Sequence, residues 1–394
     1  MVAGLLATVT AYLLGLLAAA TCRRTCVDPP RADHFRFLLL VPAHDEEQVI
    51  ADTLASLRGV DHPPDCVELI VIADRCSDDT ARLAVAAGAR VLERQTGSGG
   101  KGAALAWALE RIDLDRFDAV VVVDADCLAS PNLLSAIERR LHSGVEAVQT
   151  DYVVSNPEAG GAAALRYAAF RLVNTVRPLG KEAVGLSAGL HGTGMAFSRA
   201  VTQRHPWTTT SLIEDAEHHL ALVAAGERVA FVPEASVSSP MPSSLRASAT
   251  QQGRWESGRW TLLRRWWLPL MRAALRRRSV VQAHAAVEIL VPPQSLLLSA
   301  NALAGLAGIA LRARLATRLA LLSLAGQLVF VLGGLALVRA PPAAYRALIQ
   351  APALAVQKIW LFGLMLAGRG PRAFVRTERE ADDTPQKPVV KTRP

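Results

Sequence analysis

The chain has 394 residues, of which 51% are hydrophobic and 20% are charged, and its mean hydropathy is +0.25. This composition is too apolar for a typical soluble enzyme and too charged for a protein embedded entirely in a membrane, so it indicates a soluble domain joined to membrane helices. The formal net charge of +8 comes without a separable basic module, since the arginines cluster beside apolar or Trp-rich segments, which favours a membrane surface over nucleic acid as partner.

The chain begins with an uncharged apolar run that ends at Thr21. Its length is close to the ~20 residues of a bilayer-spanning helix, and Arg23, Arg24 and Arg31 follow it. Because positive residues mark the cytoplasmic side, we expect a transmembrane anchor over residues 1–22 followed by a cytoplasmic domain. The alternative is a cleavable signal peptide, which requires positive charge before the apolar run.

Short apolar runs alternate with helical patterns along residues 36–250. This alternation predicts an α/β domain built on a doubly wound, mainly parallel sheet. A loop rich in Gly and Ser, residues 185–197, is expected to let a ligand approach the backbone closely. Strands are expected at residues 37–42, 67–73, 90–92, 120–123, 147–152 and 229–232.

The strand at residues 120–123 runs directly into the acids Asp124 and Asp126. Ser130 and Pro131 then predict the cap and first position of a helix, so both acids lie on the loop at the strand's carboxyl end. Open α/β sheets bind ligands at that edge. Two carboxylates about 4 Å apart in a partly dry cleft repel by roughly 4 kcal/mol. A divalent ion on phosphate oxygens would relieve the repulsion, and an ordinary acidic turn is the alternative.

A glycine-rich loop, residues 97–102, carries Lys101. Backbone amides and a point charge together suit a phosphate group, although a flexible loop with a solvated lysine has the same pattern. The loop also satisfies the dinucleotide fingerprint GxGxxG, but that fingerprint belongs to the first βα turn and this loop follows the third strand. A P-loop is excluded because Gln95 stands where the first glycine is required.

Two further motifs lie nearer the C-terminus. Glu214 and Asp215 open a predicted helix, where acids ordinarily stabilise the helix dipole but where a carboxylate can also serve as a general base. Gln251, Arg254 and Trp255 recur at helical spacing. Because Trp and Arg are also usual at a membrane interface, the second motif is weak by itself.

The C-terminal part of the chain combines Trp-rich, Arg-rich and apolar segments, as expected of a membrane-associated region. We expect interface helices at residues 251–283, a transmembrane hairpin at 284–340 with crossings at 287–311 and 319–338, an interface helix at 343–380 and a disordered tail at 381–394.

The landmarks of the chain follow one another in a fixed order. They are Pro42-Ala43-His44-Asp45-Glu46, Asp74, Asp124-Ala125-Asp126, Glu214-Asp215, Gln251-Gln252-Gly253-Arg254-Trp255 and Phe374-Val375-Arg376-Thr377-Glu378-Arg379. Together they resemble the membrane-bound family 2 glycosyltransferases, the group that includes cellulose, hyaluronan and poly-N-acetylglucosamine synthases and ceramide glucosyltransferase. The resemblance implies a GT-A fold. Asp45 departs from the pattern where Asn is usual, and Ile213 where Thr is common, but neither change removes a group that the chemistry needs.

The resemblance also implies the reaction and the roles of the residues. It implies inverting transfer of a sugar from a nucleotide diphosphate donor to an acceptor hydroxyl at the cytoplasmic face. The expected donor is a UDP-sugar. Asp215 would be the catalytic base, and Asp126 would coordinate Mg²⁺ or Mn²⁺ on the diphosphate. Nucleotide-sugar binding falls to Pro42, Ala43, Glu46, Asp74, Lys101, Asp124 and Asp126, and the acceptor and diphosphate side to Glu214, Gln251, Arg254 and Trp255.

The expected product is a glycolipid or envelope glycan made at the inner (plasma) membrane. Three crossings are too few to enclose a polar sugar chain, so we expect a lipid-borne or amphipathic acceptor that arrives along the interface helices near Trp260, Trp266 and Trp267. His284 and Glu288 are candidates to meet its polar head, unless they form a satisfied pair. A processive polysaccharide synthase, a nucleotide-sugar-binding membrane protein without turnover and an NAD-dependent oxidoreductase are the alternatives.

Overall fold

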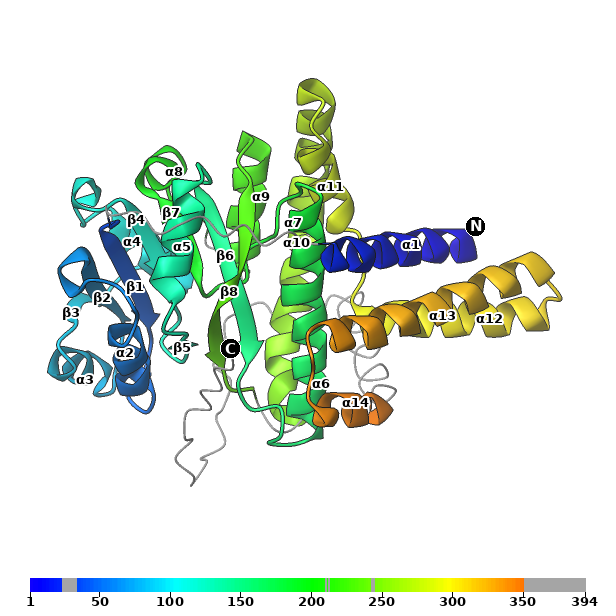
Figure 1. Cartoon of the computed structure of the whole chain (residues 1–394), viewed down its shortest axis with the longest axis horizontal. Helices are drawn as coiled ribbons and strands as arrows, with labels where there is room; N and C mark the ends of the chain where they lie inside the picture. Colours follow the sequence, from blue (N-terminus) through cyan, green and yellow to red (C-terminus); the bar gives the residue numbers. More distant parts are fainter. Residues whose placement is uncertain (23–33, 210, 212, 242–244, 351–394) are drawn as a thin grey trace.

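The computed structural model describes residues 1–22, 34–209, 211, 213–241 and 245–350, and for residues 245–256 it describes the backbone alone. An α/β domain lies at one end of the molecule (Figure 1). At the other end, three helices project from the domain side by side. They are α1 (Val2–Thr21), α12 (Gln294–Ala310) and α13 (Arg314–Leu337).

Within the described residues, eight strands form one sheet in the order β3-β2-β1-β4-β7-β6-β8-β5. The pairs β3-β2, β2-β1, β1-β4 and β6-β8 are parallel, and the other three are antiparallel. The prediction of a mainly parallel α/β domain is therefore confirmed. The strands are β1 (Phe37–Ala43), β2 (Val67–Asp74), β3 (Arg90–Arg94), β4 (Ala119–Val122), β5 (Leu128–Ala129), β6 (Ala147–Val154), β7 (Met195–Ser198) and β8 (Val229–Ser239).

Helices cover both faces of the sheet because its inner strands are apolar on both faces. Along β1, Phe37, Leu39 and Val41 join one apolar core, whereas Leu38 and Leu40 join the other. Alternate side chains of one strand thus enter two cores, as expected of a doubly wound sheet. The first core is closed by α2 (Ile50–Arg58), α3 (Thr80–Ala86) and α5 (Leu133–His142), and the second by α4 (Lys101–Leu109), α8 (Arg199–Arg204) and α9 (Glu214–Ala225).

Two local predictions in this domain were wrong. Residues 195–197, expected at the end of a loop, belong to β7, which lies antiparallel between β4 and β6. The helix after the acidic loop begins at Leu133 rather than at Pro131. The reason is that residues 128–129 first pair with β8, and the Ser130 hydroxyl accepts the Ser236 N–H instead of capping a helix. The acidic loop itself lies where it was expected, at the carboxyl end of β4.

A helical layer separates the sheet from the projecting helices. In it, α6 (Gly161–Phe170) continues through a π-helical turn, Arg171–Val176, into α7 (Arg177–Ala183). Two side chains of that turn, Arg171 and Thr175, each bond to Asp151 of β6 at 2.6 Å, which ties the layer to the sheet. On its other side α7 packs so closely against α1 that a β-carbon at Gly180 would lie 2.2 Å from the Leu16 carbonyl oxygen.

The remaining described helices follow β8 in the sequence. They are α10 (Leu245–Arg277), α11 (Val280–Glu288), α12, α13 and α14 (Pro342–Ala347), and short 3-10 turns occur at Pro64–Cys66, Leu114–Arg116 and Leu348–Gln350. The helix expected to cross at residues 287–311 begins later than predicted, since α11 ends at Glu288 and α12 begins only after Pro292 and Pro293. The crossing itself stays a prediction. The predictions for residues 351–394, including the Arg-Thr element, lie outside the described residues.

Two helices of the described chain are long and apolar enough to cross a membrane, by length and composition: α1 with 20 residues and α13 with 24. The apolar α12 is shorter, at 17 residues. Polar side chains join these three helices. The Thr10 hydroxyl lies 2.6 Å from that of Ser323 and accepts from Gln327 at 2.7 Å, and Gln327 in turn bonds to Gln294. Such contacts between apolar helices fix their relative positions.

Candidate active site

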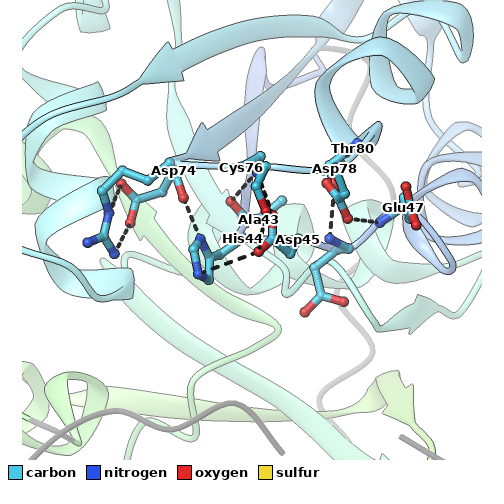
Figure 2. A network of polar contacts seen from close by, with 11 residues as sticks. Ala43, His44, Asp45, Glu47, Asp74, Cys76, Asp78 and Thr80 are labelled. Carbon is cyan, nitrogen blue, oxygen red and sulfur yellow. Dashed lines mark hydrogen bonds and ion pairs between the residues drawn. The ribbon is translucent and has the colours of Figure 1, made fainter. Parts of the chain in front are cut away.

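Two loops at the carboxyl ends of β1 and β2 are joined by hydrogen bonds (Figure 2). His44 Nδ1 lies 2.7 Å from the carbonyl oxygen of Asp74, and the Asp45 carboxylate accepts the Ser77 N–H at 2.6 Å. Asp45 has a φ of 54°, a left-handed conformation that Asp and Asn adopt more readily than most residues. Asp therefore meets the backbone requirement at a position where Asn was expected.

The residues predicted to bind the nucleotide sugar begin on the same loops. Pro42 and Ala43 end β1, where they lie in register with the last residues of β2. The backbone N–H of Glu46 donates to Thr80 Oγ1 at 2.7 Å, so the start of α3 holds the loop in place. Pro42, Ala43 and Glu46 thus form one fixed segment at the ligand-binding edge of the sheet.

Asp74, predicted to contact the nucleotide base, ends β2 and is 4% exposed. Arg94 Nη1 donates to its carboxylate at 2.6 Å, and Arg75 Nε lies 3.4 Å from it. Arg94 also donates to the carbonyl of Ser98 in the glycine-rich loop, so it links that loop to β2. Arg94 was missed by the sequence analysis. The signal that points to it is its place at the end of a parallel strand, the same as that of Asp74.

The centre of the site forms around the backbone of Gly192. Lys101 Nζ, at the start of α4, donates both to Asp124 and to the Gly192 carbonyl oxygen. A β-carbon on Gly192 would lie 3.4 Å from Asp215 Oδ2 and 3.9 Å from Asp124 Oδ2, and the φ of this glycine is 88°. Side chains from α4, the end of β4 and the start of α9 therefore converge there. The approach of a ligand to this loop, expected from the sequence, stays a prediction, and Gly192 is the position at which these side chains meet the backbone.

Five charged groups make up this edge cluster: Lys101, Asp124, Asp126, Glu214 and Asp215. Burial, reinforced by the charge of Asp126, raises the pKa of Asp124 in spite of Lys101. Burial and the charge of Asp215 raise the pKa of Glu214 to about 7. Burial also raises the pKa of Asp215, against the opposing effect of Lys101. The pKa of Lys101 is raised because Asp124, Glu214 and Asp215 outweigh its burial.

The acidic loop offers a set of metal ligands. One ligand atom each from Asp124, Asp126 and Cys127 lies within 4.8 Å of the others. Burial raises the pKa of the Cys127 thiol well above its ordinary value, helped by Asp126 and Asp124. The thiol donates to Asp126 Oδ1 at 3.5 Å. The other two ligands are carboxylate oxygens, which fit Mg²⁺ or Mn²⁺ better than zinc.

The last glycine of the GxGxxG loop has a packing role. A β-carbon at Gly102 would lie 2.0 Å from the Thr209 carbonyl oxygen and 3.1 Å from Glu214 Cβ. A side chain there would separate the start of α4 from the start of α9, and with it Lys101 from the acids. The loop follows β3, the outermost strand of the sheet, rather than the first strand as the dinucleotide fingerprint requires.

The predicted acceptor motif lies on α10. Gln251, Arg254 and Trp255 belong to this helix, and their side chains lie outside the described residues. One turn beyond Arg254, a β-carbon at Gly258 would lie 2.6 Å from Ile213 Cγ1. Because Ile213 immediately precedes the Glu-Asp pair, the backbone of α10 passes next to the start of α9.

His284 and Glu288 lie on α11, which is not itself one of the two apolar helices of spanning length in the described chain. Glu288 accepts hydrogen bonds from Arg177 at 2.8 Å and from Lys181 at 3.0 Å, both on α7. His284 Nε2 lies 2.9 Å from the Tyr12 hydroxyl. The two residues are therefore satisfied by neighbours, which was the alternative to a role at an acceptor head group. We call Arg177, Lys181 and Glu288 the α7–α11 cluster.

The chain resembles several known proteins. A probable glycosyltransferase of Bacillus subtilis, YdaM, is 24% identical over 249 residues, which are 56% of this chain and 54% of that protein. Glucomannan 4-beta-mannosyltransferase 2 of Arabidopsis thaliana is 24% identical over 252 residues, which are 60% of this chain and 46% of that protein. The chain thus spans about half the length of these curated relatives.

A solved structure and a family model agree with this likeness. The mannosyltransferase PcManGT of Pyrobaculum calidifontis, solved in complex with GDP-Man and Mn²⁺, superposes with a TM-score of 0.54 at 18% identity. The match covers 85% of this chain and 98% of that one and shows a shared GT-A-like fold. The family model described as "Glycosyltransferase like family 2" matches residues 34–258, more than half of the chain. With acids at the ends of β2 and β4 and at the start of α9, this chain belongs to family 2 of the glycosyltransferases.

Proposed function

We propose that the protein transfers a sugar, with inversion, from a nucleoside diphosphate donor to an acceptor hydroxyl. The observation that carries this proposal is the convergence of Lys101, Asp124 and Asp215 on the Gly192 peptide at the carboxyl edge of the sheet. This arrangement puts a cation suited to a diphosphate next to an acid suited to proton transfer. Those are the two groups that an inverting transfer requires from the protein.

Asp215 is assigned as the base that takes the proton from the acceptor hydroxyl. A general base works best when its pKa lies near the operating pH. Burial raises the pKa of Asp215, so it accepts a proton more readily than an exposed aspartate does. Glu214, with a pKa of about 7, is the second candidate for the same role.

The donor is assigned to the carboxyl ends of the four parallel strands β1, β2, β3 and β4. Lys101 and Asp124 would hold the diphosphate and the ribose, and Asp74 would take the base in company with Arg94. Pro42, Ala43 and Glu46 would border the nucleoside. A UDP-sugar is the first candidate, and a GDP-sugar is tested beside it because the structural neighbour PcManGT was solved with GDP-Man.

Asp126 is assigned as the protein ligand of a Mg²⁺ or Mn²⁺ ion. Asp124 already bonds to Lys101, and Mg²⁺ and Mn²⁺ prefer carboxylate oxygen to the sulfur of Cys127, so Asp126 is the better ligand. When bound, the ion stabilises the negative charge that develops on the leaving diphosphate. The Mn²⁺ in the PcManGT complex supports this assignment.

The acceptor is proposed to be lipid-borne or amphipathic, with the catalytic domain on the cytoplasmic side of the plasma membrane. Its site would be bordered by Glu214, Gln251, Arg254 and Trp255. The apolar helices α1 and α13 support spanning of the membrane. Beyond the acceptor motif, α10 exposes apolar side chains among arginines, as expected of a helix in the membrane interface. These side chains are Trp267, Leu268 and Leu275, which are 39%, 46% and 75% exposed.

The proposal is tested by donor turnover of the purified protein in detergent. UDP-sugars and GDP-sugars are assayed with Mn²⁺, with Mg²⁺ and with chelator, and then with a membrane lipid extract as the acceptor source. We expect metal-dependent release of the nucleoside diphosphate and a short glycolipid that partitions into organic solvent. A long water-soluble polymer would instead favour a processive synthase. Binding of a nucleotide sugar without turnover would favour a sensor, and a preference for NAD would refute the proposal.

A further inference from the structure

We infer that His34, His62 and Glu138 form a second divalent-metal site, of the zinc type, at the amino end of β1. One ligand atom from each of these residues lies within 4.8 Å of the others. His34 Nδ1 and Glu138 Oε2 are 3.4 Å apart. The three residues come from the segment before β1, the loop after α2 and helix α5, so the fold brings together parts of the chain that are distant in sequence.

The spacing of His34 Nδ1 and Glu138 Oε2 fits a tetrahedral ion. Zinc binds imidazole nitrogen and carboxylate oxygen at about 2.0–2.2 Å, which puts two such ligands roughly 3.4 Å apart around a tetrahedral centre. The observed separation of 3.4 Å needs no adjustment. The other separations, which are no more than 4.8 Å, would shorten as the ion binds, and the His34 side chain is 43% exposed, so solvent borders the site on that side.

The other two ligands are held in place by the backbone of one residue, Phe35. Glu138 is 8% exposed, and its Oε1 accepts the Phe35 N–H at 2.6 Å, which directs Oε2 towards His34. The Phe35 carbonyl lies 2.9 Å from His62 Nε2. Since a carbonyl only accepts, Nε2 carries the proton, and the lone pair of the neutral ring is on Nδ1. Metal-binding histidines are commonly oriented by such a bond from their second nitrogen.

The site is separate from the edge cluster. Residues Phe37–Ala43 of β1 run from the histidines to the donor loops, a length of about 20 Å for six residue steps. The ligand chemistry also differs, because two imidazoles select Zn²⁺ or Co²⁺, whereas carboxylates and phosphates select Mg²⁺ or Mn²⁺. An ion here would therefore connect the segment before β1 and the loop after α2 to helix α5, and it would take no part in sugar transfer.

The test uses full-length protein without a histidine tag, stripped with chelator and kept in excess Mn²⁺ so that the acidic loop is occupied. Zn²⁺ and Co²⁺ are then titrated, with bound metal, Co²⁺ visible absorption and the apparent melting temperature as readouts. We expect one Zn²⁺ per chain, a four-coordinate Co²⁺ spectrum and a higher melting temperature. His34→Ala and Glu138→Gln should each weaken Zn²⁺ binding by about 100-fold or more, since even outer-shell partners contribute 10–100-fold.

His205→Ala is the matched control, because His205 Nε2 also lies close to a glutamate oxygen, 3.1 Å from Glu227 Oε1. That glutamate pairs with Arg204 as well. This variant should bind Zn²⁺ like the unmodified protein. His34→Ala should keep both the metal-free melting temperature and the Mn²⁺-dependent donor turnover, which separates loss of the site from misfolding. The inference would be overturned if the unmodified protein bound no Zn²⁺ in the presence of excess Mn²⁺. It would also be overturned if His34→Ala and Glu138→Gln bound Zn²⁺ as tightly as the unmodified protein.

Discussion

The edge cluster and the α7–α11 cluster contain the same kinds of charged side chain but differ in the balance of charge. In the edge cluster, the charge of Lys101 is shared among three acids, Asp124, Glu214 and Asp215, and the pKa values of Asp124 and Asp215 are raised. In the α7–α11 cluster two cations surround one acid, Glu288. Burial alone would raise the pKa of Glu288, but Lys181 and Arg177 outweigh it and hold that pKa well below its ordinary value.

The difference shows what distinguishes a reactive cluster from a structural one in this molecule. An excess of acid leaves carboxylates that can take a proton or a divalent ion at neutral pH. An excess of cation keeps the carboxylate ionised at every physiological pH, so it can only hold the helices α7 and α11 together. Burial is common to both clusters, and the neighbours decide the direction of the pKa shift.

The strongest test removes the proposed base from the edge cluster. Asp215→Asn should lower sugar transfer by about 10² to 10⁴ fold, because the amide cannot accept the acceptor proton. Binding of the nucleoside diphosphate and of Mn²⁺ should stay within about tenfold, since the donor contacts remain. Single-turnover assays and nucleotide titrations measure the two effects separately. Wild-type turnover in this variant, together with loss of turnover in Glu214→Gln, would move the base to Glu214.

Removing the acid from the α7–α11 cluster should affect stability rather than chemistry. Glu288→Gln leaves Arg177 and Lys181 buried without their counter-ion, which typically costs about 3–5 kcal/mol of unfolding free energy. The melting temperature in detergent should fall, while turnover per folded molecule stays the same. Glu227→Gln is the control, because it removes an acid from the more exposed pair with Arg204 and should cost no more than about 1 kcal/mol. Equal losses in the two variants would contradict the comparison.

Asp126→Ala should act on the metal and donor together. Without its carboxylate the site loses the proposed ion ligand, so donor affinity should fall by roughly 10–100-fold and no longer depend on Mn²⁺. Titration of UDP and GDP with and without Mn²⁺ measures this directly. If metal-dependent nucleotide affinity persists in the variant, the ion is held elsewhere.

The smallest expected effect is a gain in stability. Glu214 has a folded pKa of about 7, above the ordinary value of 4.5, so the folded protein binds its proton more tightly than the unfolded chain does. Stability linked to this group is therefore present at low pH and is lost as pH rises through about 7. Glu214→Gln should raise stability at pH 8 by about 1 kcal/mol, or about 2–4 °C, and by less at pH 5.5. Melting scans at both pH values check this, and saturating Mn²⁺ should reduce the gain. A loss of stability at pH 8 would contradict the assigned excess of acid.

Much of the α/β domain could be predicted because its signals are local. Apolar runs such as residues 67–73 and 120–123 fall where β2 and β4 form. As predicted, Asp74 lies at the carboxyl end of β2, and Asp124 lies just after β4. In contrast, β7 was missed, because its four residues carry too short a pattern and owe their conformation to the strands on either side. The start of α12 was placed too early, since the apolar composition continues across Pro292 and Pro293 while the helix does not.

The sequence by itself determined which residue types stand at the carboxyl ends of the strands, because strand periodicity and the acids that end it are encoded within a few neighbouring positions. It also determined that α1 and α13 are apolar along a spanning length. Only the tertiary structure decided which charges meet: Arg94 with Asp74 across the neighbouring strands β3 and β2, Lys101 of α4 with Asp124 after β4, and Lys181 with Glu288 across 107 positions. The physical reason is that a pKa depends on the charges and solvent within a few ångströms of the group, and folding sets those distances between residues far apart in the chain.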